Sequence, residues 1–109
     1  MDKINQNRII RRQERIELAK NLNASKDSLS ELAKDDWWVK IEVARNKNIP
    51  INLQTELSKD PDIEIRKAVF LNDMVDDKIK LAIYNGENDN FKKAFYSHLS
   101  EKNKSVVSL

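Results

Sequence analysis

The chain has 109 residues, a length typical of one domain, with 20 basic and 18 acidic side chains and a formal net charge of +2. This near-balance argues against a dedicated nucleic-acid binder, although a local basic patch is compatible with it. The absence of cysteine excludes disulfides, thiolate nucleophiles and zinc–thiolate sites. No apolar run reaches the roughly 20 residues that span a bilayer, and no apolar leader is visible, so we expect a cytoplasmic protein without a membrane segment.

A single glycine and two prolines disfavour an all-β fold, which needs many tight turns. The chain instead repeats one helical segment of eight residues, with apolar side chains at helical spacing such as Ile65, Ala68 and Val69. The copies begin at residues 14, 39, 65 and 91, at intervals of 25, 26 and 26 residues. We therefore predict an all-α superhelix, a solenoid of about four two-helix repeats of 25–26 residues.

Residues 1–13 are predicted to form an N-terminal cap, followed by the repeats over about residues 14–98. Residues 1–26 contain seven basic and three acidic side chains. We interpret this excess as the polar end that a helical stack needs for solubility; the alternative is a patch that faces phosphate or acidic groups. Residues 1–100 would then form one domain, and residues 101–109 a polar, frayed C-terminal tail.

A second, shorter helix is predicted in each repeat, four residues after the asparagine that closes the first helix. Its starts are Ser25, Pro50 and Asp76. Ser and Asp accept a hydrogen bond from a free backbone N–H, whereas Pro has its φ preset and no N–H to lose. Residues 28–31 also fit a capping box, which would start the first of these helices one turn later.

An acid-rich turn leads from each short helix to the next long one. In the best copy Asp60 is predicted to be the N-cap and Pro61 the first helical residue. Paired acids such as Asp35 and Asp36 could in principle serve acid–base chemistry or bind a metal. We interpret them as helix caps, because an anion at a helix N-terminus is stabilising for structural reasons.

A basic residue recurs on the long helices, at Arg15, Lys40, Arg66 and Lys92. We expect ion pairs with the preceding acids, such as Arg66 with Asp35 or Asp60. The alternative is a ladder that tracks a nucleic-acid backbone together with the basic N-terminus. The candidate phosphate-binding residues are Arg8, Arg11, Arg12, Arg15, Lys40, Arg66 and Lys92.

Four aromatic residues are candidate partner-binding residues: Trp37, Trp38, Phe95 and Tyr96. Neighbours on a helix cannot both point into the core, so one tryptophan, which the sequence does not single out, is expected to pack between repeats and the other to be exposed as a binding hot spot. The alternative is that both tryptophans pack in a turn. Phe95 and Tyr96 either cover the end of the core or form an apolar patch for a partner or a second copy, giving a dimer through the C-terminal helix.

The segments Leu32-Ala33-Lys34-Asp35-Asp36-Trp37-Trp38-Val39 and Leu57-Ser58-Lys59-Asp60-Pro61-Asp62-Ile63-Glu64-Ile65, with the helices that follow them, resemble the leucine-rich repeat variant of bacterial proteins. That group is related to HEAT-like repeats, and the resemblance covers about residues 14–98. The first segment is one residue shorter in its turn than the second. The resemblance implies a right-handed superhelix of helices alternating with shorter helices, and a scaffold without a single activity.

Enzymatic constellations are poor in this sequence. His98 is the only histidine and falls at a helix end, where a cap or surface role is more common than a general base. Gly86 is the only glycine, so no Gly-rich phosphate loop can form. We predict a non-catalytic helical-repeat scaffold without cofactor or metal, which binds a protein partner through its concave face or exposed aromatics; the alternative is binding to a nucleic-acid phosphate backbone.

Overall fold

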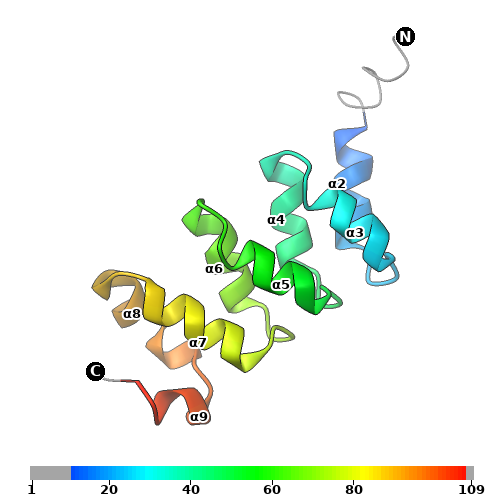
Figure 1. The fold of residues 1–109 in the computed structure, drawn as a ribbon. Helices are drawn as coiled ribbons and strands as arrows, with labels where there is room; N and C mark the ends of the chain where they lie inside the picture. Colours follow the sequence, from blue (N-terminus) through cyan, green and yellow to red (C-terminus); the bar gives the residue numbers. More distant parts are fainter. Residues whose placement is uncertain (1–10, 108–109) are drawn as a thin grey trace.

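The computed structural model describes residues 11–107, and this part of the chain contains α-helices, one short 3₁₀ helix and no strand. The all-α prediction is therefore confirmed. Three helices of nine residues each lie side by side and form one layer of the molecule (Figure 1). They are α2 (Arg12–Lys20), α4 (Trp37–Arg45) and α6 (Ile63–Leu71).

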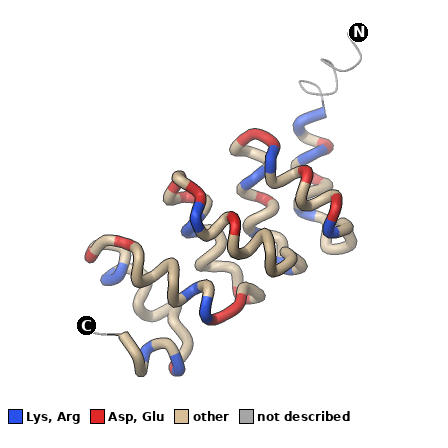
Figure 2. The backbone as a smooth tube through the Cα atoms, in the orientation of Figure 1, with Lys and Arg blue, Asp and Glu red and all other residues tan. Residues whose placement is uncertain are grey.

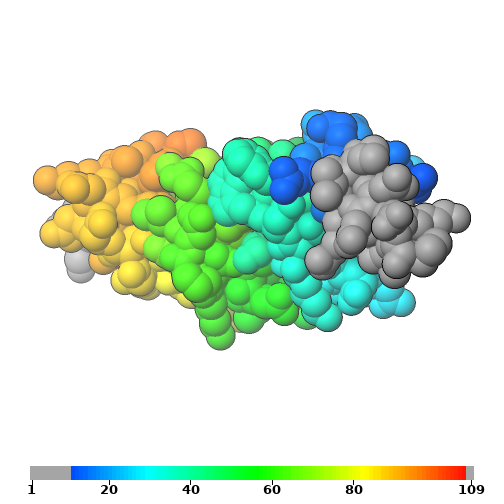
Figure 3. All heavy atoms as spheres, turned by 90° about the horizontal axis from the view of Figure 1, so that it is seen from above, coloured from blue at the N-terminus to red at the C-terminus, as the bar shows by residue number. Residues whose placement is uncertain are grey.

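The helices that connect these three form a second layer, which lies in front in Figure 1. They are α3 (Lys26–Leu32), α5 (Ile51–Leu57) and α7 (Asp77–Gly86). The described chain ends with α8 (Asp89–Phe95), the 3₁₀ helix η1 (Tyr96–His98) and α9 (Glu101–Lys104). The molecule measures 55 × 25 × 17 Å, and its segments follow one another along the long axis in sequence order (Figure 3). Contacts between the helices are thus made mainly by neighbours in the sequence.

The predicted starts of the connecting helices are confirmed. Ser25 is the N-cap of α3, and its hydroxyl accepts the N–H of Ser28, so the helix does not start a turn later. Pro50 and Asp76 are the N-caps of α5 and α7. Asparagine is the C-cap of α2, α4 and α6 alike. Local sequence therefore fixes the ends of these helices.

The predicted start of α6 was wrong, because its N-cap is Asp62 and not Asp60. Pro61 consequently lies in the turn and not in the first helical position. The Asp62 carboxylate accepts the N–H of Glu64, while Asp60 accepts the N–H of Asp62 and the ammonium of Lys40. Asp60 is already engaged by a side chain from another helix, so the second acid of the turn caps the helix.

A buried asparagine closes α4 and α6 and binds each helix to the long helix before it. The Asn46 amide donates to the carbonyls of Ala19 (2.7 Å) and Asn21 (3.0 Å), and the Asn72 amide donates to those of Ala44 (3.0 Å) and Asn46 (2.9 Å). The last carbonyls of a helix have no partner within it. Each asparagine satisfies such carbonyls on the preceding helix and thereby fixes the spacing of the long helices.

The core runs between the two layers along the whole stack. Val39 and Val43 of α4 and Ile65 and Val69 of α6 are fully buried. They lie at i and i+4 on the same helix face, and burying such side chains typically stabilises a fold by about 1.5–3 kcal/mol each. Phe70 extends this core toward the C-terminal end, where its ring packs edge-on against two phenylalanines of α8.

The segment expected to be a frayed tail is instead helical over Glu101–Lys104 and is packed against α7. Ser100 caps this helix, α9, and its hydroxyl also bonds the carboxylate of Asp77 at 2.6 Å. The buried Asn103 amide donates to the backbone carbonyl of Asp77 at 2.9 Å. These bonds bridge residues 23 and 26 positions apart, so a local pattern could not reveal them.

Candidate partner-binding surface

The recurring cations of the long helices form a ladder of ion pairs with the acid-rich turns. Arg15 Nε lies 2.7 Å from Asp35, and Lys40 Nζ lies 2.7 Å from Asp60. A third pair joins Arg66 Nε to Glu87 at 2.6 Å. Figure 2 shows the acidic turns along one edge of the stack, with basic residues beside them. The expectation of ion pairs is confirmed for these three cations.

The partners differ from those expected, because each cation reaches the turn that follows it in the sequence and not the preceding one. The carboxylate lies 20 or 21 residues after the cation in all three pairs. Arg66 does contact Asp60, but through the backbone carbonyl, to which its Nη1 donates at 2.8 Å. The ladder therefore links each long helix to the turn that starts the next one.

Two residues of this ladder, Asp60 and Arg66, have pKa values shifted by their ion-pair partners. Burial tends to raise the pKa of Asp60, but hydrogen bonds from Lys40 and from the Asp62 N–H outweigh it, and the pKa lies below its ordinary value. The hydrogen bond to Glu87 raises the pKa of Arg66. Both shifts favour the charged forms, so these residues are ion pairs at neutral pH.

The other candidate phosphate-binding residues are placed as follows. Arg12 Nε lies 2.8 Å from Asp36, and Arg11 Nε lies 3.9 Å from Glu14. The ammonium of Lys92 lies over the ring of Tyr84, 6.0 Å from its centre. Arg8 is outside the described residues. A phosphate that bound along this edge would have to displace the carboxylates that the cations already contact.

The two tryptophans are both exposed, at the start of α4. Trp37 is 36% exposed and Trp38 is 55% exposed, so the expected burial of one of them between repeats does not occur. Their rings are in edge-to-face contact, with centres 4.8 Å apart. Ile63, which begins the neighbouring α6, is also exposed. The start of α4 therefore presents a large aromatic surface to solvent.

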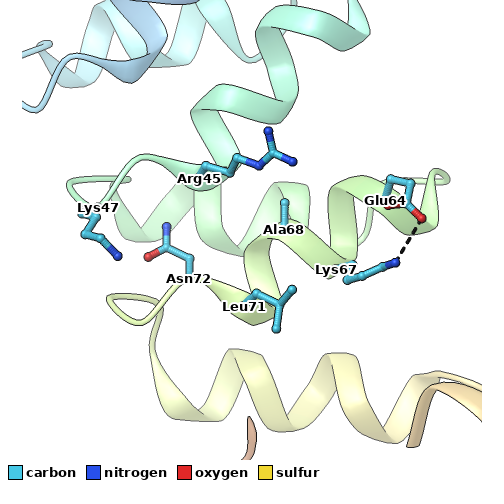
Figure 4. Close-up of a pocket in the computed structure, with 7 residues that line it drawn as sticks. All are labelled: Arg45, Lys47, Glu64, Lys67, Ala68, Leu71 and Asn72. Atoms are coloured by element: carbon cyan, nitrogen blue, oxygen red, sulfur yellow. Dashed lines mark ion pairs between the residues drawn. The ribbon is translucent and has the colours of Figure 1, made fainter. Parts of the chain in front are cut away.

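A groove of about 250 Å³ lies between α4 and α6 on the long-helix layer (Figure 4). Arg45 and Lys47 come from the end of α4 and the turn after it, while Glu64, Lys67 and Leu71 come from α6. Its lining is completed by Ala68 and Asn72. Ala68 and Leu71 supply the apolar part of the lining, and the other five residues are polar or charged, with charges of both signs.

The groove and Trp38 belong to one helix face. Trp38, Glu42 and Arg45 are spaced i, i+4, i+7 on α4, which places them along one stripe. The equivalent stripe on α6 contains Glu64 and Leu71, the latter 41% exposed. Sequence analysis identified the tryptophan but not the groove residues. The stripe complementary to the buried positions of α4 and α6 was the signal that could have found them.

The other two candidate aromatics, Phe95 and Tyr96, pack against the C-terminal end of the hydrophobic core. Phe95 is half-buried, with its ring centre 4.6 Å from that of Phe91 and with the ammonium of Lys67 5.8 Å from its own centre. Tyr96 is also half-buried, and the ammonium of Lys104 lies 5.5 Å from its ring centre. The exposed fraction of Phe95 and of Tyr96 is therefore smaller than that of Trp38.

Within residues 11–107, no three His, Asp or Glu side chains are close enough to hold a metal ion. His98 is exposed, and its ring packs on Phe95 with centres 5.6 Å apart. None of the described helices has both the length and the apolar character needed to cross a lipid bilayer.

Comparison of the chain with protein-family models, with curated proteins and with solved structures gave no match. The candidate surface is therefore defined by its own geometry: an exposed tryptophan pair that leads along α4 into a groove shared with α6.

Proposed function

We propose that the protein is a small, non-catalytic helical-repeat scaffold whose long-helix face binds a protein partner. The proposal includes the solenoid arrangement of about four repeats and the relation to the leucine-rich repeat variant. The sequence intervals of 25 and 26 residues support it, as do the contacts that recur at nearly the same spacing, namely the ion-pair ladder and the asparagine bonds. Stacks of this kind offer extended faces for partners and need no reactive centre.

The observation that carries the proposal is the exposed pair Trp37 and Trp38. Tryptophan is the side chain most enriched in binding hot spots, because one residue can bury a large area when a partner covers it. The exposed parts of the two rings add no burial to the fold, and the edge-to-face contact between them is typically worth only about 0.5–1.5 kcal/mol beyond area burial. Covering them with an apolar partner surface would recover the hydrophobic stabilisation.

The groove between the end of α4 and α6 lies on the same helix face as Trp38 and would orient a partner. One apolar side chain of the partner can cover Trp38, and a second one can cover the exposed part of Leu71, at the end of α6. Polar groups of the partner can then bond the rim residues Arg45 and Lys67, whose charges stay partly in water. An apolar centre with a polar rim is the usual anatomy of a protein interface.

The proposal can be tested by crosslinking from a photoreactive benzoylphenylalanine placed at position 38, with position 51 as the control. Ile51 lies on α5, in the other layer, and is similarly exposed at 58%. We expect a partner to be crosslinked from position 38 and not from position 51. The affinity of that partner should fall at least about tenfold, or about 1.4 kcal/mol, on Trp38→Ala.

The matched control is Ile51→Ala, which also removes an exposed apolar side chain and should change the affinity less than about twofold. Because the chain contains only two tryptophans, its intrinsic fluorescence reports on this surface alone. Equal losses of affinity for the two variants, or a partner that leaves the tryptophan emission unchanged, would refute binding at this face.

A further inference from the structure

The face of α2 that points away from α4 is exposed, although the corresponding faces of α4 and α6 are buried. Leu18 is 52% exposed, whereas Val43 and Val69, at the equivalent positions, are fully buried. Asn21 is likewise exposed, whereas Asn46 is buried. In Figure 1, α2 stands at one end of the row of long helices. Its outward face is lined by Gln13, Glu14, Glu17, Leu18 and Asn21.

The buried equivalents show what this kind of face does. Val43 and Asn46 place α4 against α2, with the Asn46 amide on the carbonyls of Ala19 and Asn21. The same arrangement recurs one helix later, where Asn72 donates to two carbonyls at the end of α4. A branched apolar side chain with an asparagine three residues later thus docks a helix on the last turn of another helix, twice within this chain.

We propose that the outward face of α2 docks the C-terminal turn of an α-helix from another protein. The docked helix offers free last-turn carbonyls to the Asn21 amide and a small side chain to Leu18. Glu14 stands where α4 and α6 carry Val39 and Ile65, and its carboxylate lies 3.9 Å from exposed Arg11. Beside it, Glu17 accepts a hydrogen bond from the neutral amide of Gln13 and keeps its negative charge toward this face. The fitting helix therefore carries basic side chains toward this face, unlike an all-apolar helix from a core. This inference concerns a different surface from the tryptophan face and stands independently of it.

A second copy of the chain is a poor occupant. The surfaces of α2 and α4 that accept an asparagine are already covered by α4 and α6. The far end is covered by residues 99–104, of which Leu99 and Asn103 are buried.

The probe is a peptide of residues 11–24, since α2 is the helix whose carbonyls accept the Asn46 amide in the structure. Peptides of this length are marginal helices in water. A lactam between Gln13→Lys and Glu17 of the peptide therefore holds it helical, on the side opposite its Ala19. The peptide is titrated into the full ¹⁵N-labelled chain and followed by NMR.

We expect saturable shifts of the Leu18 backbone amide and the Asn21 side-chain amide. Leu18→Asp in the protein should weaken the peptide at least about tenfold, because it removes the apolar contact. Lys20→Asp, which changes an exposed side chain on another face of α2, is the matched control and should weaken it far less. Ala19→Glu in the peptide should abolish binding, because it blocks the surface next to the accepting carbonyl.

Three results would overturn the proposal. The first is the absence of saturable shifts at Leu18 and Asn21, or binding that survives Leu18→Asp. The second is a concentration-dependent dimer of the chain that Leu18→Asp abolishes, since a second copy would then occupy the face. The third is a set of NOEs between the methyl groups of Leu18 and those of Ile4, Ile9 or Ile10 in the free protein, which would place the chain's own start there.

Discussion

Replacing Asn72 by alanine tests whether the buried asparagines hold the long helices together. The side chain donates to the carbonyls of Ala44 (3.0 Å) and Asn46 (2.9 Å) and accepts the N–H of Met74 (3.0 Å). Removing three hydrogen bonds worth roughly 1 kcal/mol each should cost about 3 kcal/mol of unfolding free energy. The Asn46 carbonyl keeps the N–H of Ile49, so Ala44 and Met74 carry most of the loss.

The assay is urea unfolding, followed by circular dichroism and by tryptophan fluorescence. Asn21→Ala is the matched control, because Asn21 also ends a long helix and caps the N–H of Asn23 but is exposed. Water can replace the hydrogen bond that Asn21→Ala removes at this exposed position, so the loss of unfolding free energy in this variant should stay below about 1 kcal/mol. If the two variants lost the same stability within about 0.5 kcal/mol, the asparagines would be local caps and not ties between helices.

Asn72→Asp sharpens the same test. Aspartate keeps an acceptor for the Met74 N–H, but its carboxylate faces two carbonyl oxygens and has no proton to donate. We expect this variant to be less stable than Asn72→Ala at pH 7. Burial against these carbonyls raises the pKa of the new carboxyl in the folded state. The variant should therefore recover stability relative to Asn72→Ala as the pH falls through that raised pKa, and the recovery should be complete below about 4, the ordinary value of an aspartate. A constant difference between the two variants from pH 7 to pH 3 would contradict the assigned hydrogen bonds.

Three further predictions follow from the ladder. Because the pKa of Asp60 is lowered from 3.8, its ionisation stabilises the fold at neutral pH and this contribution is lost as the pH falls through the lowered pKa. Asp60→Asn should therefore cost about 1–2 kcal/mol at pH 7, and in urea titrations its stability should converge with that of the wild type as the pH falls through the lowered pKa of Asp60. Arg66→Lys should cost about 1–2 kcal/mol in the same titrations, because one ammonium cannot replace the paired bonds to Glu87 and the bonds to two backbone carbonyls; a loss below about 0.3 kcal/mol would show that charge alone matters. Gel shifts with a DNA duplex should show no band that weakens steeply with salt, since Arg15, Lys40 and Arg66 already contact carboxylates; a steep salt dependence would restore the phosphate interpretation.

The acid-rich turns show how far a local pattern can be interpreted. Sequence reasoning identified their acids as caps, and Asp36, Asp62 and Asn88 do cap the three helices that follow. It could not separate the capping residue from the acid just before it, which binds the recurring cation of another helix. Asp36 both caps α4 and pairs with Arg12. The two roles need the same residue type, and only the packing of the long helices decides which side chain meets the cation.

The sequence by itself determined the helical class, the spacing of the long segments and most helix ends. These depend on residues within one or two turns of each other, where apolar spacing, Ser25, Pro50, Asp76 and the closing asparagines act locally. The tertiary structure alone decided the partner of each cation, the bonds of Asn46 and Asn72, the packing of α9 and the exposure of both tryptophans. Each of these joins or separates groups that lie 20 or more residues apart or on different helices, and such distances are set by how whole helices pack against one another.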